Sequence, residues 1–240
     1  MHSRRTYREA EKGTQSQTIM LFHATEYRDY PTGGTTGTIK RFLKYTTYDC
    51  LLVGSTCTVS EKVGKWHKID VEGRLFDFLP IARSWHEIIP SKITLLAGTV
   101  IFHRRILQKC RDNTLNVMIF VDRQCYTALR YIVARDKQIN AIYKITDAKN
   151  PLEDSSRPVS KIKLLQKLYF KFFFLPLLMD SRLIFSINDK CREFCERTLH
   201  APEERKKLVD LNHYVDFNEL LAFYETATDH RKGGRNARQL

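Results

Sequence analysis

Five runs of β-branched and aromatic residues constrain the fold of this chain more than any other feature of its sequence. Residues of these types favour the pleated, partly buried surface of a sheet, so each run predicts a strand. The runs are YTTYDCLLVGSTCTV (45–59), KITLLAGTVIF (92–102), LNVMIFV (115–121), NAIYKIT (140–146) and RLIFSI (182–187). Gly54, in the first run, is a candidate β-bulge. A chain with this many strands must bury a sheet, and its hydrophobic content of 42% suits such a core.

Helical patterns lie between and after these runs. The clearest is IARSWHEII (81–89), in which Ile81, Trp85, Ile88 and Ile89 recur on one side of a helix. The other predicted helices are 188–199, 202–211 and 216–227. Because strands and helices do not alternate regularly, the predicted class is α+β. We expect a single mixed domain with a twisted, largely antiparallel sheet and packed helices, flanked by flexible basic N- and C-terminal arms.

The boundaries of that domain follow from polarity and turn residues. Residues 1–38 predict a flexible basic N-terminal arm, because cations and a polar run precede the turn-rich PTGGTTGT. The folded core is expected over 39–228, with a loop or a sub-domain break near 150–158 (NPLEDSSRP). Residues 229–240 form a basic C-terminal tail. This tail contains RKGGRNAR, which is a candidate nuclear localisation signal.

Two short segments of the predicted arm could carry a function, and the sequence excludes one for the second of them. TIMLFHA (18–24) is an apolar island that could dock on the domain or on a partner. The glycines of PTGGTTGT do not form a P-loop, because Gly37 is followed by Thr38 and Ile39 rather than by lysine and a hydroxyl residue.

The charge of the chain favours a polyanionic partner. Lys and Arg number 40 against 27 Asp and Glu, a formal net charge of +13, which suits nucleic acid or an anionic lipid surface. Motifs that read bases are absent from the sequence, so contacts with nucleic acid would go to phosphates and would weaken steeply with salt. The alternative is that the charged ends serve only solubility. The candidate polyanion-binding residues are Arg4, Arg5, Arg8, Lys12, Arg104, Arg105, Lys109, Arg111, Arg231, Lys232, Arg235 and Arg238.

The segment KLYFKFFFLPLLM (167–179) is unusually apolar for so basic a chain. In a helix, Lys163, Lys167 and Lys171 would form a basic stripe beside aromatic residues that include Phe172 and Phe173, as in an interfacial membrane helix. In a strand, this stripe would not exist. Burying one Phe contributes about 1.5–3 kcal/mol, against about 1 kcal/mol for one Lys near an anionic membrane. Core burial is therefore the stronger expectation, and a membrane or partner face is the alternative.

The sequence contains no recognisable catalytic or metal-binding motif. The six cysteines form no CxxC pair, and HExxH and GxSxG are absent. Cys191 and Cys195 are expected to be reduced thiols on one face of a helix, which favours a cytosolic or nuclear compartment. We therefore predict a protein that is not an enzyme and that uses neither cofactor nor metal.

FDFLPIARSWHEIIPSKITLLAGTVIF (76–102) resembles the central element of rhabdovirus matrix proteins, in which a helix leads into an apolar segment. The resemblance rests on Trp85, Glu87, Ile88 and Ile89, and the family shares the length and basicity of this chain. It implies a structural layer that bridges ribonucleoprotein and the inner face of the lipid envelope and that self-associates during virion assembly.

The implied partners are a viral nucleocapsid or RNA, an anionic membrane surface, further copies of the chain and, if the tail is a nuclear signal, host nuclear import factors. The implied locations are the virion, the host cytoplasm, the inner membrane face and, with that signal, the host nucleus. The chain lacks the PPxY and PTAP budding motifs of animal members, having only DYPTGG at 29–34. This departure argues against recruitment of the host budding machinery and is more compatible with a plant-infecting member, in which such motifs are less consistently expected.

Two other functions stay open at this point. A plant-virus movement or accessory protein that binds single-stranded nucleic acid through phosphate contacts would share the basic charge and the mixed strands. An enzyme with an unfamiliar site is the third alternative.

Overall fold

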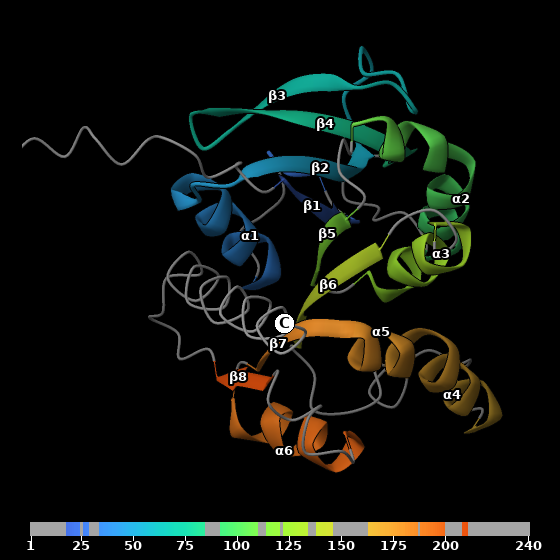
Figure 1. The fold of residues 1–240 in the computed structure, drawn as a ribbon. Helices are drawn as coiled ribbons and strands as arrows, with labels where there is room; N and C mark the ends of the chain where they lie inside the picture. Colours follow the sequence, from blue (N-terminus) through green and yellow to red (C-terminus); the bar gives the residue numbers. More distant parts are fainter. Residues whose placement is uncertain are drawn as a thin grey trace, which may run out of the picture.

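A single eight-stranded sheet runs through the computed structural model of the chain, with helices on both of its faces (Figure 1). The order of the strands across the sheet is β3-β4-β2-β1-β5-β6-β7-β8. The structure describes residues 18–24, 26–28, 34–84, 92–109, 114–120, 122–133, 138–145, 163–186, 188–199 and 208–210. The strands are β1 (Thr18–His23), β2 (Asp49–Thr56), β3 (His67–Val71), β4 (Arg74–Arg83), β5 (Thr114–Ile119), β6 (Gln138–Ile145), β7 (Ser181–Ser186) and β8 (Leu208–Asp210).

Seven of these strands are parallel, and only β3 runs antiparallel, against β4. The predicted mixed sheet with packed helices is confirmed, but the largely antiparallel arrangement is wrong, and the class is α/β. Parallel sheets are covered by helices on both faces, so their strands are apolar along their whole length. That is the pattern of β1, in which residues 19–23 are all buried.

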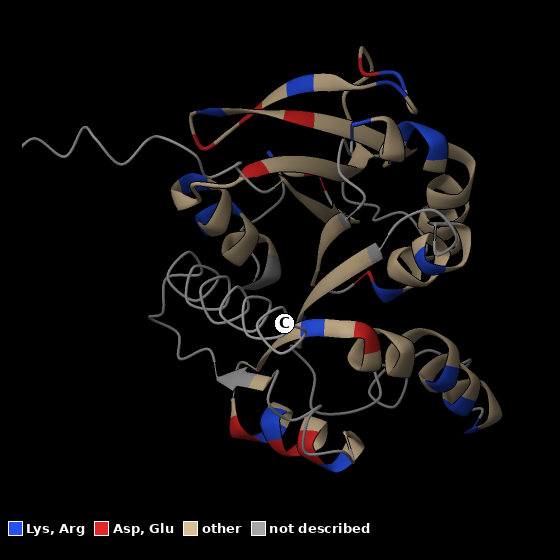
Figure 2. Cartoon of the chain, in the orientation of Figure 1, with Lys and Arg blue, Asp and Glu red and all other residues tan. Residues whose placement is uncertain are grey.

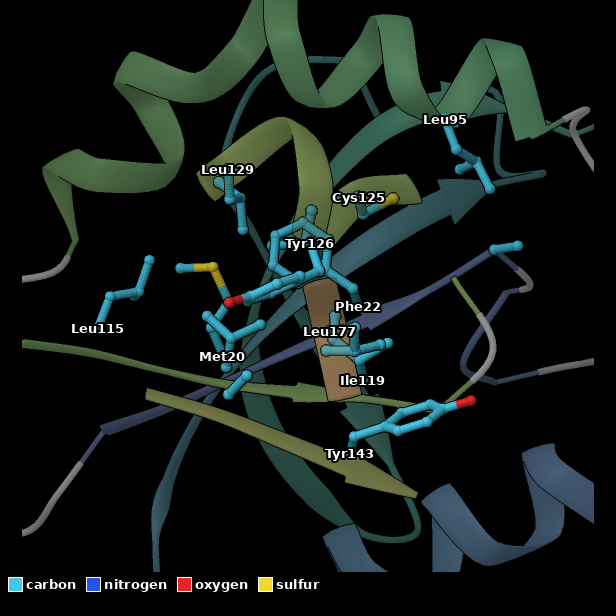
Figure 3. Packing of buried hydrophobic residues seen from close by; sticks show 14 of the residues in the cluster. Met20, Phe22, Leu95, Leu115, Ile119, Cys125, Tyr126, Leu129, Tyr143 and Leu177 are labelled. Atoms are coloured by element: carbon cyan, nitrogen blue, oxygen red, sulfur yellow. The ribbon is translucent and has the colours of Figure 1, made fainter. Parts of the chain in front are cut away.

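The helices divide into two layers. Those of the described residues are α1 (Gly34–Tyr45), α2 (Lys92–Gln108), α3 (Arg123–Val133), α4 (Lys163–Tyr169), the π-helical turn η2 (Phe170–Phe174), α5 (Leu175–Asp180) and α6 (Asp189–Thr198). Helix α1 packs its Ile39, Phe42 and Leu43 on one face of the sheet. Helices α2, α3, α5 and α6 contribute to the core on the other face, where Phe22, Tyr126 and their neighbours pack (Figure 3).

Four of the five predicted strands are confirmed as β2, β5, β6 and β7. The predicted bulge is also confirmed, because the pairing of β2 with β4 changes register between Gly54 and Ser55. A Cβ atom on Gly54 would lie 2.4 Å from the backbone oxygen of His23, so glycine allows β2 to approach the end of β1.

We expect Gly54→Ala to destabilise the fold by about 1–3 kcal/mol, because the backbone of β1 or β2 must shift to relieve this overlap. Urea unfolding measures the change, and Gly37→Ala is the control, since a Cβ atom on Gly37 would have no neighbour within 4 Å. Equal stability of the Gly54 variant and the wild type would contradict the close approach.

The fifth predicted strand, 92–102, is wrong, because these residues lie in α2. Only one side of this segment is buried: Leu95, Thr99 and Ile106 lie inside, whereas Ile93 and Ile101 are exposed. A short apolar run does not distinguish a strand from a buried helix.

Two helix predictions also need correction. Of 81–89, residues 81–83 belong to β4, while 85–89, which carry the cluster of the viral resemblance, lie outside the described residues. Of 202–211, residues 208–210 form β8. The prediction for 188–199 is confirmed by α6, which begins after Asn188, whose side chain accepts a hydrogen bond from the Cys191 amide. The predicted helix 216–227 lies outside the described residues.

The predicted N-terminal arm contains two elements of the fold. Residues 18–23 form β1, which lies between β2 and β5 inside the sheet, and α1 begins at Gly34. The apolar island of the sequence is therefore a central strand, because it is buried between helices on both faces. Residues 1–17, the break near 150–158 and the tail at 229–240 lie outside the described residues.

The segment that contains 167–179 is helical, as α4, η2 and α5. This settles the choice between helix and strand, and the basic stripe exists. Within the described part of the chain, no helix is long and apolar enough to cross a membrane.

Candidate functional site

The strand order reverses beside β1. From β1 the chain proceeds outward through β2 to β4, and then returns to add β5, β6 and β7 on the other side of β1. In open parallel sheets, ligands bind at the carboxyl ends of the strands at such a switch point. The side chains found there on this chain are those of His23, at the end of β1, Asp122, just after β5, and Lys144, near the end of β6.

His23 and Asp122 form a buried pair at this edge. Nδ1 of His23 lies 3.8 Å from Oδ2 of Asp122, and the two side chains are 4% and 5% exposed. The same Oδ2 accepts a hydrogen bond of 2.7 Å from the Ala24 amide, which joins the segments that follow β1 and β5. On its other side, Nε2 of His23 lies 3.3 Å from Oγ1 of Thr36 in α1. The imidazole is thus held between α1 and Asp122.

Buried polar atoms without a partner gather at this edge. Among the described residues, three such side-chain atoms have no hydrogen bond: Nδ1 of His23, Oγ of Ser84 and Oε1 of Gln124. Ser84 follows β4, and Gln124 lies in the first turn of α3 and donates to Asp122 through its amide nitrogen, at 3.3 Å. Because buried polar groups are nearly always paired, unpaired ones indicate a place where water or a ligand completes the bonding.

The first turns of α1 face the same edge. The sequence there is GTTGT, and its first turn holds no acidic residue. The first amides of a helix have no partner within the helix, and its dipole is positive at that end, so an anion is favoured there. Gly37 lies in this stretch, with open space where a Cβ atom would be. Packing therefore does not require glycine at this position, although glycine weakens a helix.

Lys144 supplies a buried cation next to these turns. Its side chain is 8% exposed, and Nζ donates to Oγ1 of Thr38 at 3.1 Å. It also lies 5.9 Å from the centre of the Phe120 ring. No carboxylate of the described residues lies within ion-pair distance of Nζ. Burial, and then the positive charge of Arg41, lower the pKa of Lys144 to about 8. A buried cation that faces another cation is stabilised by an anion.

The segment after β1 is fixed by a separate charged cluster. Arg28 donates to Glu26 at 2.8 Å and to both oxygens of Glu61, at 2.7 and 3.0 Å. Thr56, at the end of β2, donates to Glu61 at 2.5 Å. Burial alone would raise the pKa of Glu61, but the hydrogen bonds from Arg28 and Thr56 outweigh it and lower the pKa. All of these charges are paired, so this cluster positions the loop rather than offering a binding site.

This carboxyl edge of the sheet is therefore suited to binding an anion. It offers the amides of the first turn of α1, the hydroxyl groups of Thr36 and Thr38, and the Lys144 cation. No group of three or more His, Cys, Asp or Glu side chains in the described ranges could hold a metal ion.

The predicted polyanion-binding residues are not part of this edge. Arg104 and Arg105 lie on α2, and Lys109 directly follows its last residue; Arg105 and Lys109 are engaged within the chain. Arg105 donates to the Gly64 carbonyl, and Lys109 forms an ion pair of 2.9 Å with Asp77. The other candidates lie outside the described residues: Arg4, Arg5, Arg8, Lys12, Arg111, Arg231, Lys232, Arg235 and Arg238.

The predicted membrane or partner face is on α4 and η2, and none of its residues belongs to the edge described above. Lys163, Lys167 and Lys171 are exposed, Phe172 is 46% exposed, and Phe173 is partly buried. The predicted thiols Cys191 and Cys195 are fully buried and are not joined in a disulfide, as expected.

Sequence reasoning missed Lys144, His23 and Gly37. Lys144 lies within NAIYKIT, a strand predicted correctly, but a lysine in a strand is usually solvent-exposed. The sequence did contain one signal: an apolar island is followed by PTGGTTGT and then by an amphipathic helix. A strand leads into a helix in this order at a phosphate-binding turn.

Comparison with known proteins gives the fold alone. No family model matches the sequence, and a search of curated proteins found no match. Among solved structures, sucrose-phosphate synthase from Thermosynechococcus elongatus matches with a TM-score of 0.54 and 7% sequence identity. The match covers 81% of this chain and 47% of the synthase chain, so this chain spans about half of that protein. The matrix-type function, with its partners and locations, and the non-enzymatic character stay predictions.

Proposed function

We propose that this chain binds a phosphorylated small molecule of the nucleotide class at the carboxyl edge of its sheet, between α1 and the end of β6. The observation that carries the proposal is Lys144, a buried lysine whose Nζ is directed at Thr38 of α1 and is not paired with a described carboxylate. A diphosphate would replace the missing counter-charge and would accept hydrogen bonds from the first amides of α1.

Three further features support this proposal. The site lies at the point where the strand order reverses, which is where doubly wound sheets bind nucleotides. Unpaired buried polar atoms of His23 and Gln124 lie at the same edge. The synthase that shares the fold is named for a sugar phosphate, and a phosphate group is what the cations here would recognise.

Isothermal titration calorimetry of the full chain tests the proposal. The ligands are inorganic phosphate, pyrophosphate, adenosine diphosphate, uridine diphosphate and a single-stranded RNA oligonucleotide. We expect one site per chain for pyrophosphate and for at least one of the nucleoside diphosphates. If none of the small phosphates binds, the proposal fails. Binding of the RNA alone would instead support the predicted contact of basic surfaces with nucleic acid.

Gly37→Ala separates a binding role of α1 from a structural one. We expect this variant to be more stable than the wild type by about 0.5–1 kcal/mol, because alanine is the better helix former and the position is open. We also expect weaker binding of the diphosphate by about tenfold, because a methyl group would occupy space beside the helix amides. Urea unfolding and calorimetry measure the two effects. Unchanged diphosphate affinity would place the ligand away from Gly37.

A further inference from the structure

The helical segment α4–η2 presents a basic and apolar surface that neither the sheet nor the proposed anion site uses. Residues 163–179 contain three lysines and no acid. In Figure 2 this part of the chain shows blue bands and no red ones, and Figure 1 places α4 at the periphery, beyond α5. Lys163, Lys167 and Lys171 are all exposed, and none of them has a carboxylate partner among the described residues.

An apolar stripe runs beside the lysines. Leu164, Leu168 and Phe172 each follow one of the lysines by one position, so they form a second row at four-residue spacing. Their side chains are 64%, 40% and 46% exposed. Apolar side chains this exposed, in a row beside cations, are typical of a helix that lies in a membrane interface.

The inner side of the same segment is firmly packed. Phe174, Leu177 and Leu178 are fully buried, and the ring of Phe174 stacks on that of Phe170 at 5.4 Å and meets that of Phe194 edge-on at 5.6 Å. The core therefore fixes which side of the segment faces outward. The stripe of Leu164, Leu168 and Phe172 is outside this core, so packing among the described residues does not explain why they are apolar.

We propose that the outer face of α4–η2 binds the surface of an anionic lipid bilayer, with the helix parallel to the membrane plane. The lysines would contact lipid phosphates and carboxylates while the leucines and Phe172 enter the boundary of the acyl chains. A bilayer fits better than a protein partner, because a bilayer receives a row of cations and a row of apolar groups side by side without a matched surface. This inference is independent of the proposed nucleotide function.

The test is flotation of the full chain with vesicles of phosphatidylcholine alone or with 30% phosphatidylserine. We expect binding to the anionic vesicles and little to the neutral ones. The variant Lys163→Glu/Lys167→Glu/Lys171→Glu should lose at least about 100-fold in partition coefficient, because each lysine removed is worth about 1 kcal/mol near an anionic surface and each glutamate added is repelled by it. Leu168→Ser/Phe172→Ser should lose about tenfold while keeping the lysines.

A matched control has the same change of charge elsewhere. Lys62, Lys65 and Lys190 are exposed on other elements, so their replacement by glutamate should leave most of the binding intact. Circular dichroism and urea unfolding report whether each variant is folded, and neither measurement depends on the proposed nucleotide site. Equal losses in the control and in the α4 variant would overturn the proposal in favour of net charge. Binding of the wild type to an acidic polypeptide or RNA but not to vesicles would overturn it in favour of a macromolecular partner.

Discussion

The Lys144→Met variant is expected to bind a nucleoside diphosphate about 10- to 100-fold more weakly than the wild type, because it loses a charge-assisted hydrogen bond of about 1.5–3 kcal/mol. Methionine keeps an unbranched apolar side chain but removes the ammonium group, which lies 5.9 Å from the centre of the Phe120 ring. Calorimetry at pH 7 measures the affinity, and Lys190→Met, an exposed lysine on α6, is the control. Wild-type affinity in the Lys144 variant would remove the observation on which the proposed function depends.

The same substitution should stabilise the protein without ligand. Burial lowers the pKa of Lys144 from 10.5 to about 8, so the folded state releases a proton that the unfolded state keeps between these two values. The stability of the wild type therefore rises with pH across this window. At pH 7 the buried charge costs about 2 kcal/mol, which methionine avoids.

Urea unfolding at pH 7 and pH 10 measures this effect. We expect the methionine variant to be more stable by about 2 kcal/mol at pH 7, with a smaller difference at pH 10, because the wild-type lysine is then largely neutral. Diphosphate should narrow or reverse this difference at pH 7, since it stabilises the wild type more than the variant, which binds it about 10- to 100-fold more weakly. A variant less stable than the wild type at pH 7 without ligand would contradict the cost assigned to the buried charge.

Arg28→Met is expected to destabilise the fold by about 3 kcal/mol, because it leaves the buried carboxylates of Glu26 and Glu61 without their cation. The lowered pKa of Glu61 means that its contribution is present above pH 4.5 and is lost as the pH falls through the folded-state value. The difference between wild type and variant should therefore shrink in acid.

Urea unfolding at pH 7 and pH 4 measures this difference. The control is Arg192→Met, which breaks an exposed pair with Glu196 on α6 and should cost only about 0.3–0.5 kcal/mol. Adding Glu61→Gln to Arg28→Met should recover part of the stability, because one unpaired charge is removed. Equal effects of Arg28→Met and Arg192→Met would show that the Arg28 cluster does not hold the segment after β1.

The sequence was informative where a pattern is local. The strands β5, β6 and β7 are compact apolar runs, and α6 begins at an Asn cap, so the types of these elements could be predicted. The bulge at Gly54 followed from a glycine within a strand pattern. The continuous apolar run in α2 fits both the two-residue period of a strand and the 3.6-residue period of a helix. Only the packing of one side of this segment on the sheet decides in favour of a helix.

Strand order could not be predicted in this way. β1 is six residues long and lies between a polar stretch and a glycine-rich one, so its central place in the sheet had no local signal. Whether neighbouring strands are parallel depends on the place in the sheet to which the chain returns after each helix. The candidate site could not be predicted for the same reason. His23 and Lys144 are about 120 positions apart in the sequence, and only the strand order β1-β5-β6 brings both residues toward α1.

The most direct test of the anion site is a nuclear magnetic resonance titration of ¹⁵N-labelled protein with uridine or adenosine diphosphate. We predict that the largest amide shifts fall on Thr36, Gly37 and Thr38, at the start of α1, and on Lys144. We also predict that these shifts are much smaller in the Lys144→Met variant at a ligand concentration near the wild-type Kd. Amide shifts confined to α2 or α4, or equal shifts in the variant, would contradict the assignment of the phosphate site to this edge of the sheet.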